Sequence, residues 1–345
     1  MNAPFLSLRL SALRGHMKYN PALDGIRALA IALILVYHSG QEWHLGGFVG
    51  VDVFFVLSGF LITSLLTEEI KNSQIIDLKR FYTGRAMRLY PNLTIMILFF
   101  LVASPFLWPE ANSTKESLLS LFYLTDYSIV FINEPTVLAH TWSLSIEEHF
   151  YLIWPMLLPL ILRSNSPTRT LIVLYVLATA WRFFNQYSIG WAPTYFRFDT
   201  RLSGFFLGGL ISISRITLSK RFGIIGIIGL PLLALQDSYN TNEGTTVNIL
   251  AAELCAALII SSSINSGAVY SILSSAPFVA IGKLSYGIYL WHFPAMLWLR
   301  DKYSWETTLL LGASFSLAIS FVIYRTIEVP IGNLRRQKYR AALPD

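Results

Sequence analysis

An arginine and a histidine share one face of a helix that the sequence predicts near its N-terminus. Arg27 and His38 are eleven residues apart, which is close to three helical turns and places their side chains on one stripe, about 16 Å apart along the axis. The residues between them are almost wholly aliphatic, so we expect this helix to lie in a bilayer, where an ionisable group costs about 2.5–3.5 kcal/mol and usually marks a functional path. A buried imidazole is a suitable general base for an alcohol. The alternative interpretation is a snorkelling arginine and an interfacial histidine, with Asp24 as a carboxylate at the helix start.

Carboxylates and hydroxyls lie within two further apolar segments. Asp52 stands in the run Gly-Val-Asp-Val-Phe-Phe, where a lone carboxylate requires a partner such as an arginine or a histidine. In the polar segment that starts at His140, Ser143, Glu147 and Tyr151 follow one another at every fourth position, so they share one helical face. We therefore expect a polar cavity for a hydroxyl-rich ligand at the non-cytoplasmic side. The segment lacks a His-Glu-x-x-His pattern, and no metal site is expected.

A pair of arginines lies at the predicted cytoplasmic edge of the membrane. Arg85 and Arg88 occupy positions i and i+3 and so share a helical face. Because arginines bind phosphate oxygens through forked hydrogen bonds, the pair is suited to the phosphates of a soluble cofactor such as coenzyme A. The alternative is attraction to anionic lipids together with a role in setting topology.

Lesser polar features lie toward the C-terminus. Tyr289 and His292 share one helical face, an arrangement equally consistent with an aromatic belt at the membrane interface. Glu328 ends the last predicted span, and we expect it to form a charge pair with Arg325.

The composition is that of an integral membrane protein. Of 345 residues, 54% are hydrophobic and 13% are charged, the mean hydropathy is +0.53, and apolar runs leave no block for a separate soluble domain. The net charge of +6 does not indicate a nucleic-acid partner, because the basic residues cluster in short segments between apolar runs, as the positive-inside rule requires. Cys255 is the only cysteine, which excludes an internal disulfide and a cysteine-based metal site.

The hydrophobic runs predict an all-α, polytopic fold with about ten transmembrane helices. If the basic loops, of which 67–88 is the richest, all face the cytoplasm, both termini are cytoplasmic. The shorter stretch 118–132, which contains Asp126, is then expected to be re-entrant or interfacial. The chain divides into a cytoplasmic leader (1–18), a membrane domain (19–330) and a basic cytoplasmic tail (331–345). The ten predicted spans are 26–44, 48–66, 89–108, 141–162, 170–187, 200–214, 222–236, 247–263, 284–300 and 306–326.

Taken together, these segments resemble those of the integral membrane acyltransferase family 3, bacterial enzymes similar to O-antigen and exopolysaccharide O-acetyltransferases. The resemblance extends from about Tyr19 to Pro330. The family commonly has Gln at the position of His149. Because some relatives carry a further helix and an esterase-like domain and this chain ends at Asp345, we expect a stand-alone form. Five motifs in order carry the resemblance: Asp24-Gly-Ile-Arg27 followed by His38, Gly50-Val-Asp-Val-Phe-Phe-Val-Leu-Ser-Gly-Phe60, Arg85-x-x-Arg88, His140-Thr-Trp-Ser-Leu-Ser-Ile-Glu-Glu-His-Phe-Tyr-Leu152 and Thr326-Ile-Glu-x-Pro330.

The resemblance implies transfer of an acyl group, usually acetyl from acetyl-CoA, from the cytoplasm to a hydroxyl of a cell-surface carbohydrate. The reaction would take place in the bacterial inner membrane among its lipids, without a metal, on an acceptor such as O-antigen or exopolysaccharide that is free or lipid-linked. A stand-alone chain implies either a single-protein reaction or a separate partner protein. The implied roles are a base or acyl carrier (His38), groups that orient and stabilise it (Asp52, Glu147), ligands of the CoA phosphates (Arg27, Arg85, Arg88), acceptor contacts (His140, Ser143, Glu148, Tyr151) and structural charges (Asp24, Arg325, Glu328).

Two other functions fit the same residues. His38, Asp52 and Glu147 could form the proton relay of a transporter for an acyl group or a lipid-linked sugar. The lack of an internal repeat of about 20–50 residues weakens that interpretation. A non-catalytic membrane partner of a separate transferase would tolerate substitution of Arg85 and Arg88.

Overall fold

The protein is a bundle of helices. The computed structural model describes residues 19–40, 46–236, 239–264 and 266–340, and within these ranges it contains helices and no strand, as the hydrophobic pattern predicts. Five segments are long and apolar enough to cross a bilayer: Pro21–His38, Gly47–Ser73, Leu78–Leu107, Gly244–Ser263 and Trp305–Leu334. The chain is therefore a multi-pass membrane protein.

The helices follow one another with short connections. The first half of the chain forms α2 (Pro21–His38), α3 (Gly50–Ser73), α4 (Leu78–Leu107), α5 (Ser113–Leu121), α6 (Thr125–Ile132), α7 (Trp142–Arg163) and α8 (Pro167–Ile189). The second half forms α9 (Trp191–Phe196), α10 (Leu202–Ser214), α11 (Lys220–Ala234), α12 (Ile249–Ser263), α13 (Ala268–Leu273), α14 (Ala276–Arg300), α15 (Trp305–Ile323) and α16 (Val329–Arg340). Short 3₁₀ turns cover Gly47–Val49, Ala139–Thr141 and Phe198–Thr200, and π-helical turns cover Gly244–Asn248 and Tyr324–Glu328.

Polar caps set where several helices begin. The side chains of Asn20, Asp77 and Ser166 each accept a hydrogen bond from a main-chain N–H in the first turn of α2, α4 and α8. Pro21 and Pro167 occupy the first helical positions, where a missing N–H costs nothing. The hydrophobic run alone predicts a start at residue 26. Because Asn20 caps the helix, α2 begins at Pro21 instead.

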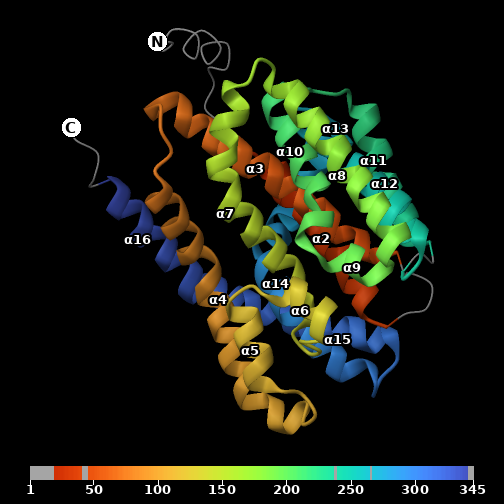
Figure 1. Ribbon diagram of the computed structural model, residues 1–345. Coiled ribbons are helices and arrows are strands. Elements are labelled where there is room, and N and C mark those ends of the chain that lie inside the picture. The colour runs from red at the N-terminus through yellow and green to blue at the C-terminus, as the bar shows by residue number, and fades with distance from the viewer. Residues whose placement is uncertain (1–18, 41–45, 237–238, 265, 341–345) are drawn as a thin grey trace.

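The helices gather into groups that Figure 1 shows side by side. α4, α5 and α16 lie on one side of the molecule, α8 and α10–α13 lie on the other, and α2, α3, α7 and α14 lie between them. α2 packs against α3 and α14, α3 against α10, and α14 against α15. The central helices and α4 together surround the site described below.

Glycines allow α3 and α10 to cross closely. A Cβ atom at Gly59 would lie 2.2 Å from the main-chain oxygen of Phe205, and one at Gly208 would lie 2.0 Å from that of Val56, so neither position accepts a side chain. Small residues permit such an approach between membrane helices. The crossing brings the residue that precedes α10, Arg201, into contact with α3.

Each predicted span overlaps a helix of the described residues, although residues 41–44 of the span 26–44 lie outside those residues. A total of ten crossings and cytoplasmic termini stay predictions. α10 and α11 contain 13 and 15 residues, fewer than the roughly 20 that a perpendicular crossing requires. The stretch 118–132 is divided between α5 and α6, which contain 9 and 8 residues. Both are too short to cross a bilayer, in agreement with the predicted re-entrant or interfacial position.

The basic segment 67–88 is helical over most of its length, which corrects the prediction of a loop. α3 continues to Ser73 and α4 begins at Leu78, so only residues 74–77 connect them. Gln74 ends α3 in the left-handed conformation with φ 64°. Arg85 and Arg88 therefore project from the early turns of a helix, which fixes their directions relative to one another.

The predicted boundaries at the two ends have different outcomes. The leader 1–18 lies outside the described residues. The basic tail does not begin a new element, because α15 continues through the π-helical turn Tyr324–Glu328 into α16, which ends at Arg340. The predicted boundary at residue 330 therefore falls inside a helix.

Candidate active site

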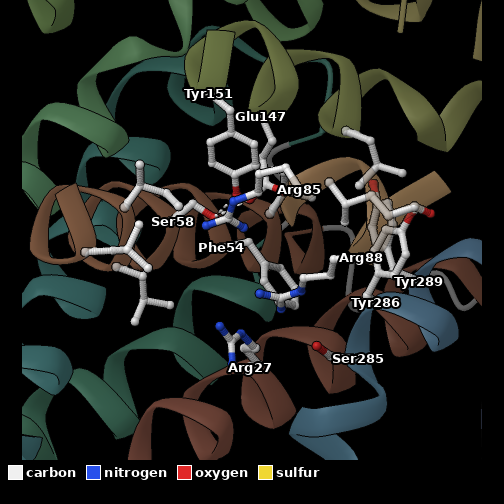
Figure 2. Close-up of a pocket in the computed structure, with 16 residues that line it drawn as sticks. Arg27, Phe54, Ser58, Arg85, Arg88, Glu147, Tyr151, Ser285, Tyr286 and Tyr289 are labelled. Carbon is white, nitrogen blue, oxygen red and sulfur yellow. Dashed lines mark hydrogen bonds between the residues drawn. The ribbon is translucent and has the colours of Figure 1, made fainter. Parts of the chain in front are cut away.

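Three arginines from two helices line one cavity of about 240 Å³, here called the arginine cavity. α2 contributes Arg27, and α4 contributes Arg85 and Arg88. Figure 2 shows the three guanidinium groups gathered in the cavity. The other polar residues that line it come from α3, α7 and α14: Ser58, Glu147, Tyr151, Ser285, Tyr286 and Tyr289.

Two of these arginines, Arg27 and Arg85, have contacts that hold them in place. Arg27 forms an ion pair with Asp24, and Asp24 also accepts a hydrogen bond of 2.6 Å from the hydroxyl of Tyr19. The guanidinium of Arg85 lies 4.6 Å from the centre of the Tyr151 ring, a cation–π contact. Among the described residues, neither Arg85 nor Arg88 forms an ion pair with a carboxylate. The cavity therefore carries a net positive charge that suits an anion.

A chain of hydroxyls holds Glu147 at the edge of the arginine cavity. Tyr151 donates a hydrogen bond of 3.1 Å to the oxygen of Ser58, and Ser58 donates to Glu147. Glu147 is thus fixed by α3 and faces the arginines, as Figure 2 shows. Tyr151, from the predicted acceptor face of α7, thus lines the same cavity as the predicted phosphate ligands of α4.

Three histidines from different parts of the chain form a second group, here called the histidine cluster: His38, His140 and His292. Nδ1 of His38 lies 2.9 Å from Nε2 of His292. The ring of His140 lies 5.8 Å from that of His292, and Nε2 of His140 lies 3.1 Å from the main-chain oxygen of Leu290. His140 and His292 are buried, whereas His38 keeps partial exposure.

Tyr289 connects the arginine cavity to the histidine cluster. Its side chain lines the cavity, and its ring lies 5.6 Å from that of His140 and 5.4 Å from that of His292. Its hydroxyl lies 2.6 Å from the hydroxyl oxygen of Ser143 and donates to the main-chain oxygen of His140. The arginine cavity and the histidine cluster are thus neighbours, separated by one aromatic side chain.

Comparison with known proteins identifies the family. Residues 20–325 match the family described as Acyltransferase domain, which is most of the chain. The chain belongs to this acyltransferase family. It is 31% identical over 361 residues to O-acetyltransferase OatA of Staphylococcus aureus, covering 94% of this chain and 58% of that protein.

Further relatives carry names of the same kind. The chain is 33% identical to peptidoglycan O-acetyltransferase OatA of Listeria monocytogenes, over 92% of this chain and 56% of that protein. It is 31% identical to putative peptidoglycan O-acetyltransferase YrhL of Bacillus subtilis, over 94% of this chain and 56% of that protein. The chain thus spans little more than half the length of these relatives. No solved structure matches the chain.

The structure corrects the prediction that Asp52 or Glu147 orients His38, because each of the three side chains has another partner. Asp52 lies 2.7 Å from Arg201, with both side chains buried, and Glu147 accepts from Ser58. The close crossing of α3 and α10 supplies the arginine partner that the apolar surroundings of Asp52 require. The observed hydrogen-bond partner of His38 is instead His292.

The predicted pair of Arg325 and Glu328 is absent from the ion pairs of the described residues. Glu328 accepts a hydrogen bond of 2.9 Å from the side-chain amide of Asn92, and Arg325 lies over the ring of Phe321. Both charged residues belong to the π-helical turn Tyr324–Glu328. Its wider i→i+5 turn removes the i,i+3 alignment of an α-helix, which explains why the pair does not form.

The remaining predicted acceptor contacts lie in different places. Tyr151 lines the arginine cavity, Ser143 reaches it only through Tyr289, and His140 belongs to the histidine cluster. Glu148 is not among the residues that line the cavity. His292 and Tyr289 are the functional candidates that sequence reasoning undervalued, because their shared helical face is also that of an aromatic belt.

Proposed function

We propose that this protein is a membrane-embedded O-acyltransferase that transfers an acyl group, most simply acetyl, from cytoplasmic acyl-CoA to a hydroxyl of a cell-surface carbohydrate. The observation that carries the proposal is the arginine cavity beside the histidine cluster. Arg85 and Arg88 lack carboxylate partners among the described residues, as expected of groups kept for an anionic ligand. Membership of the acyltransferase family supports the reaction type.

The donor site would be the arginine cavity. Its volume of about 240 Å³ suits the phosphate-bearing end of a CoA molecule rather than the whole of it, so the remainder must extend beyond the cavity. Arg27 and His38 are about 16 Å apart along α2, so an arm that runs along this helix would bring the thioester toward the histidine cluster. The spacing of Arg27 and His38 thus fits a donor held at one end and reacting at the other.

The transfer step would use His38 as the base. A sugar hydroxyl attacks the thioester carbonyl carbon while Nε2 of His38 accepts the hydroxyl proton, and a carbon–oxygen bond forms. The carbon–sulfur bond then breaks, and His38 returns the proton to the leaving thiolate, which gives the ester and free CoA. General-base assistance of this kind contributes typically 10²–10⁴-fold.

The acceptor class is a surface glycan. The relatives from Listeria and Bacillus are named for peptidoglycan, whereas the motifs in the sequence also resemble those of enzymes acting on O-antigen and exopolysaccharide. Peptidoglycan is therefore the first acceptor to test, followed by these two polymers and their lipid-linked precursors. We place the enzyme in the bacterial inner membrane with both termini in the cytoplasm, in accord with its basic segments.

The test is an assay of transfer with phosphate-bearing and phosphate-free donors. Membranes containing the protein, radiolabelled acetyl-CoA and each glycan should give acetylated glycan, and acetyl-pantetheine, which lacks the nucleotide phosphates, should have a much higher KM. The double variant Arg85→Ala/Arg88→Ala should lose most of this discrimination. Arg80→Ala is the matched control, because Arg80 lies on the same helix but pairs with Glu69.

The same assay separates the rival functions. Movement of an acyl group or lipid-linked sugar across the membrane by the wild type, without ester formation, would show a transporter. Ester formation that persists at full rate in the double variant would contradict the assigned donor site. A requirement for a second transferase would show a non-catalytic partner.

A further inference from the structure

His292 is held in one orientation by the main chain of its own helix. Its side chain is fully buried on α14, and its Nδ1 atom lies 2.7 Å from the main-chain oxygen of Tyr289 and 3.2 Å from that of Ile288. A carbonyl oxygen accepts hydrogen bonds and cannot donate them. Nδ1 of His292 must therefore carry the proton that it shares with these oxygens.

The position of that proton determines the protonation of the next imidazole. In neutral His292, a proton on Nδ1 leaves Nε2 with a lone pair. Nε2 lies 2.9 Å from Nδ1 of His38, so the proton of this hydrogen bond belongs to His38. Neutral His38 then has its own lone pair on Nε2, the atom that faces away from His292.

We propose that His292 is a positioning residue that fixes His38 in the tautomer with a free Nε2, the form that can accept the proton of an acceptor hydroxyl. The inference rests on the proposed function, because it assigns the cause of the basicity that the transfer step requires. In the part of the chain that the structure describes, no group is hydrogen-bonded to Nε2 of His38. Among the described residues that atom is therefore left without a protein partner.

The other ionisable groups around His38 do not replace this contact. His140, which packs near both histidines, lies 3.1 Å from the oxygen of Leu290 through its Nε2, so its proton is used there. Arg300, on the same helix as His292, lies beside Gly40 just beyond α2 and acts on His38 only through its charge. Tyr37, the residue before His38, contacts it with a tilted ring at 4.8 Å between ring centres. His292 is thus the neighbour that can accept the Nδ1 proton.

The arrangement has a consequence for the charged state of His38. When Nε2 accepts the hydroxyl proton, His38 becomes an imidazolium, and its Nδ1–H bond to His292 becomes charge-assisted and stronger. In serine hydrolases a carboxylate stabilises the imidazolium. Here a neutral imidazole that is anchored by main-chain carbonyls would stabilise it. Asp52, which the sequence suggested for the role, is occupied by Arg201.

Substitution of His292 separates hydrogen bonding from packing. His292→Gln places an amide oxygen near the position of Nε2 and keeps an acceptor, whereas His292→Phe keeps an aromatic ring and removes it. We expect kcat of the Phe variant to fall about 10²–10⁴-fold with KM for acetyl-CoA changed by less than about threefold. The Gln variant should recover at least about tenfold of that loss. His149→Gln, a histidine change outside the cluster, should keep wild-type kcat.

A spectroscopic measurement tests the tautomer without relying on activity. Nitrogen-15 NMR of histidine-labelled protein in nanodiscs should assign the proton of neutral His38 to Nδ1, with His38→Ala used to identify the signal. In His292→Phe, the signal should report a mixture of both tautomers. If the wild-type proton lies on Nε2, the inference is wrong, whatever the enzyme does.

The two readouts distinguish failure of this inference from failure of the proposed function. If the wild type forms no ester but the NMR signals are as expected, the positioning by His292 stands and the assigned reaction fails. If the wild type is active and folded His292→Phe keeps wild-type kcat, the reaction stands and the positioning role fails. Equal loss of kcat in the folded Gln and Phe variants would also overturn it, because the acceptor would then have no effect.

Discussion

The arginine cavity and the buried ion pair between α8 and α12 contain the same residue types in opposite states. In the cavity, Arg85 and Arg88 form no ion pair with any described carboxylate and face an open volume. In the other region, Arg182 of α8 lies 2.8 Å from Glu253 of α12, with both side chains fully buried. Ser203 of α10 bonds to both members of that pair.

The difference shows which charges hold the fold together and which are kept for a ligand. A charge buried in a membrane protein is tolerated when a partner and hydrogen bonds surround it. Arg182 has a carboxylate and a hydroxyl as partners inside the protein, whereas the half-buried Arg85 and the exposed Arg88 have no carboxylate partner among the described residues. Arg27 and Arg88 also act on one another as like charges. The ion pair of Arg182 and Glu253 should therefore govern stability, and the arginine cavity should govern binding and rate.

The largest expected effect lies beyond the cavity, at His38, the proposed base. His38→Ala should lower acetyl transfer about 10²–10⁴-fold, because the base that accepts the hydroxyl proton is gone. The melting temperature of the purified protein should stay close to that of the wild type, since His38 is partly exposed and only one hydrogen bond is lost. Initial rates and thermal melts measure the two effects. A variant that still acetylates the glycan at the wild-type rate would refute the assigned base.

The next largest effect is expected at the buried ion pair, on the stability of the protein. Arg182→Ala should destabilise the protein by about 3–5 kcal/mol, because it leaves the carboxylate of Glu253 buried without its partner. Chemical or thermal unfolding in detergent measures the change. The double variant Arg182→Met/Glu253→Leu should restore most of the stability, since removing both charges removes the unpaired one. If Arg182→Ala instead changed KM for acetyl-CoA and left stability intact, the division between the two regions would be wrong.

The fold and the residue types of the site could be predicted from the sequence, whereas the contacts between those residues could not. Aliphatic runs are local, so the helices could be predicted from them, and the i, i+3 spacing of Arg85 and Arg88 predicted that the two share a helical face. The partners of Asp52 and His38 lie 149 and 254 residues away along the chain, and no periodicity in one segment specifies a contact at that distance. The acceptor of the His292 proton is a main-chain oxygen of its own helix, which the sequence does not distinguish from any other.

Local geometry explains the remaining differences between prediction and structure. Arg325 and Glu328 stand at i and i+3 and should meet on an α-helix, but the π-helical turn separates them. The predicted loop 67–88 became two helix ends because caps at Gln74 and Asp77 leave only a short connection. Composition identifies charged segments, but it does not show whether a helix runs through them.

A smaller effect should follow from removing one free charge of the cavity. Arg88→Ala should raise KM for acetyl-CoA about tenfold, the value of one hydrogen bond to a charged group. Its stability should be unchanged or slightly higher, because Arg27 loses a like-charged neighbour. Competition by adenosine 3′,5′-bisphosphate, which carries phosphates without a thioester, should weaken in parallel. A fall in stability comparable with that of Arg182→Ala would show that Arg88 is structural.

The smallest effect is expected at Arg325, a charge that belongs to neither region. Its side chain is exposed and contacts the ring of Phe321, so Arg325→Ala should change stability by no more than about 0.5 kcal/mol and leave KM and kcat unaltered. Glu328→Ala provides the contrast, because it removes the acceptor of the Asn92 amide and with it a hydrogen bond that links α4 to the π-helical turn Tyr324–Glu328. Unfolding of both single variants and the double variant measures the coupling between them. Since the π-helical turn keeps the two side chains apart, the two changes should be additive within about 0.5 kcal/mol, and a larger coupling would mean that the charge pair forms in solution after all.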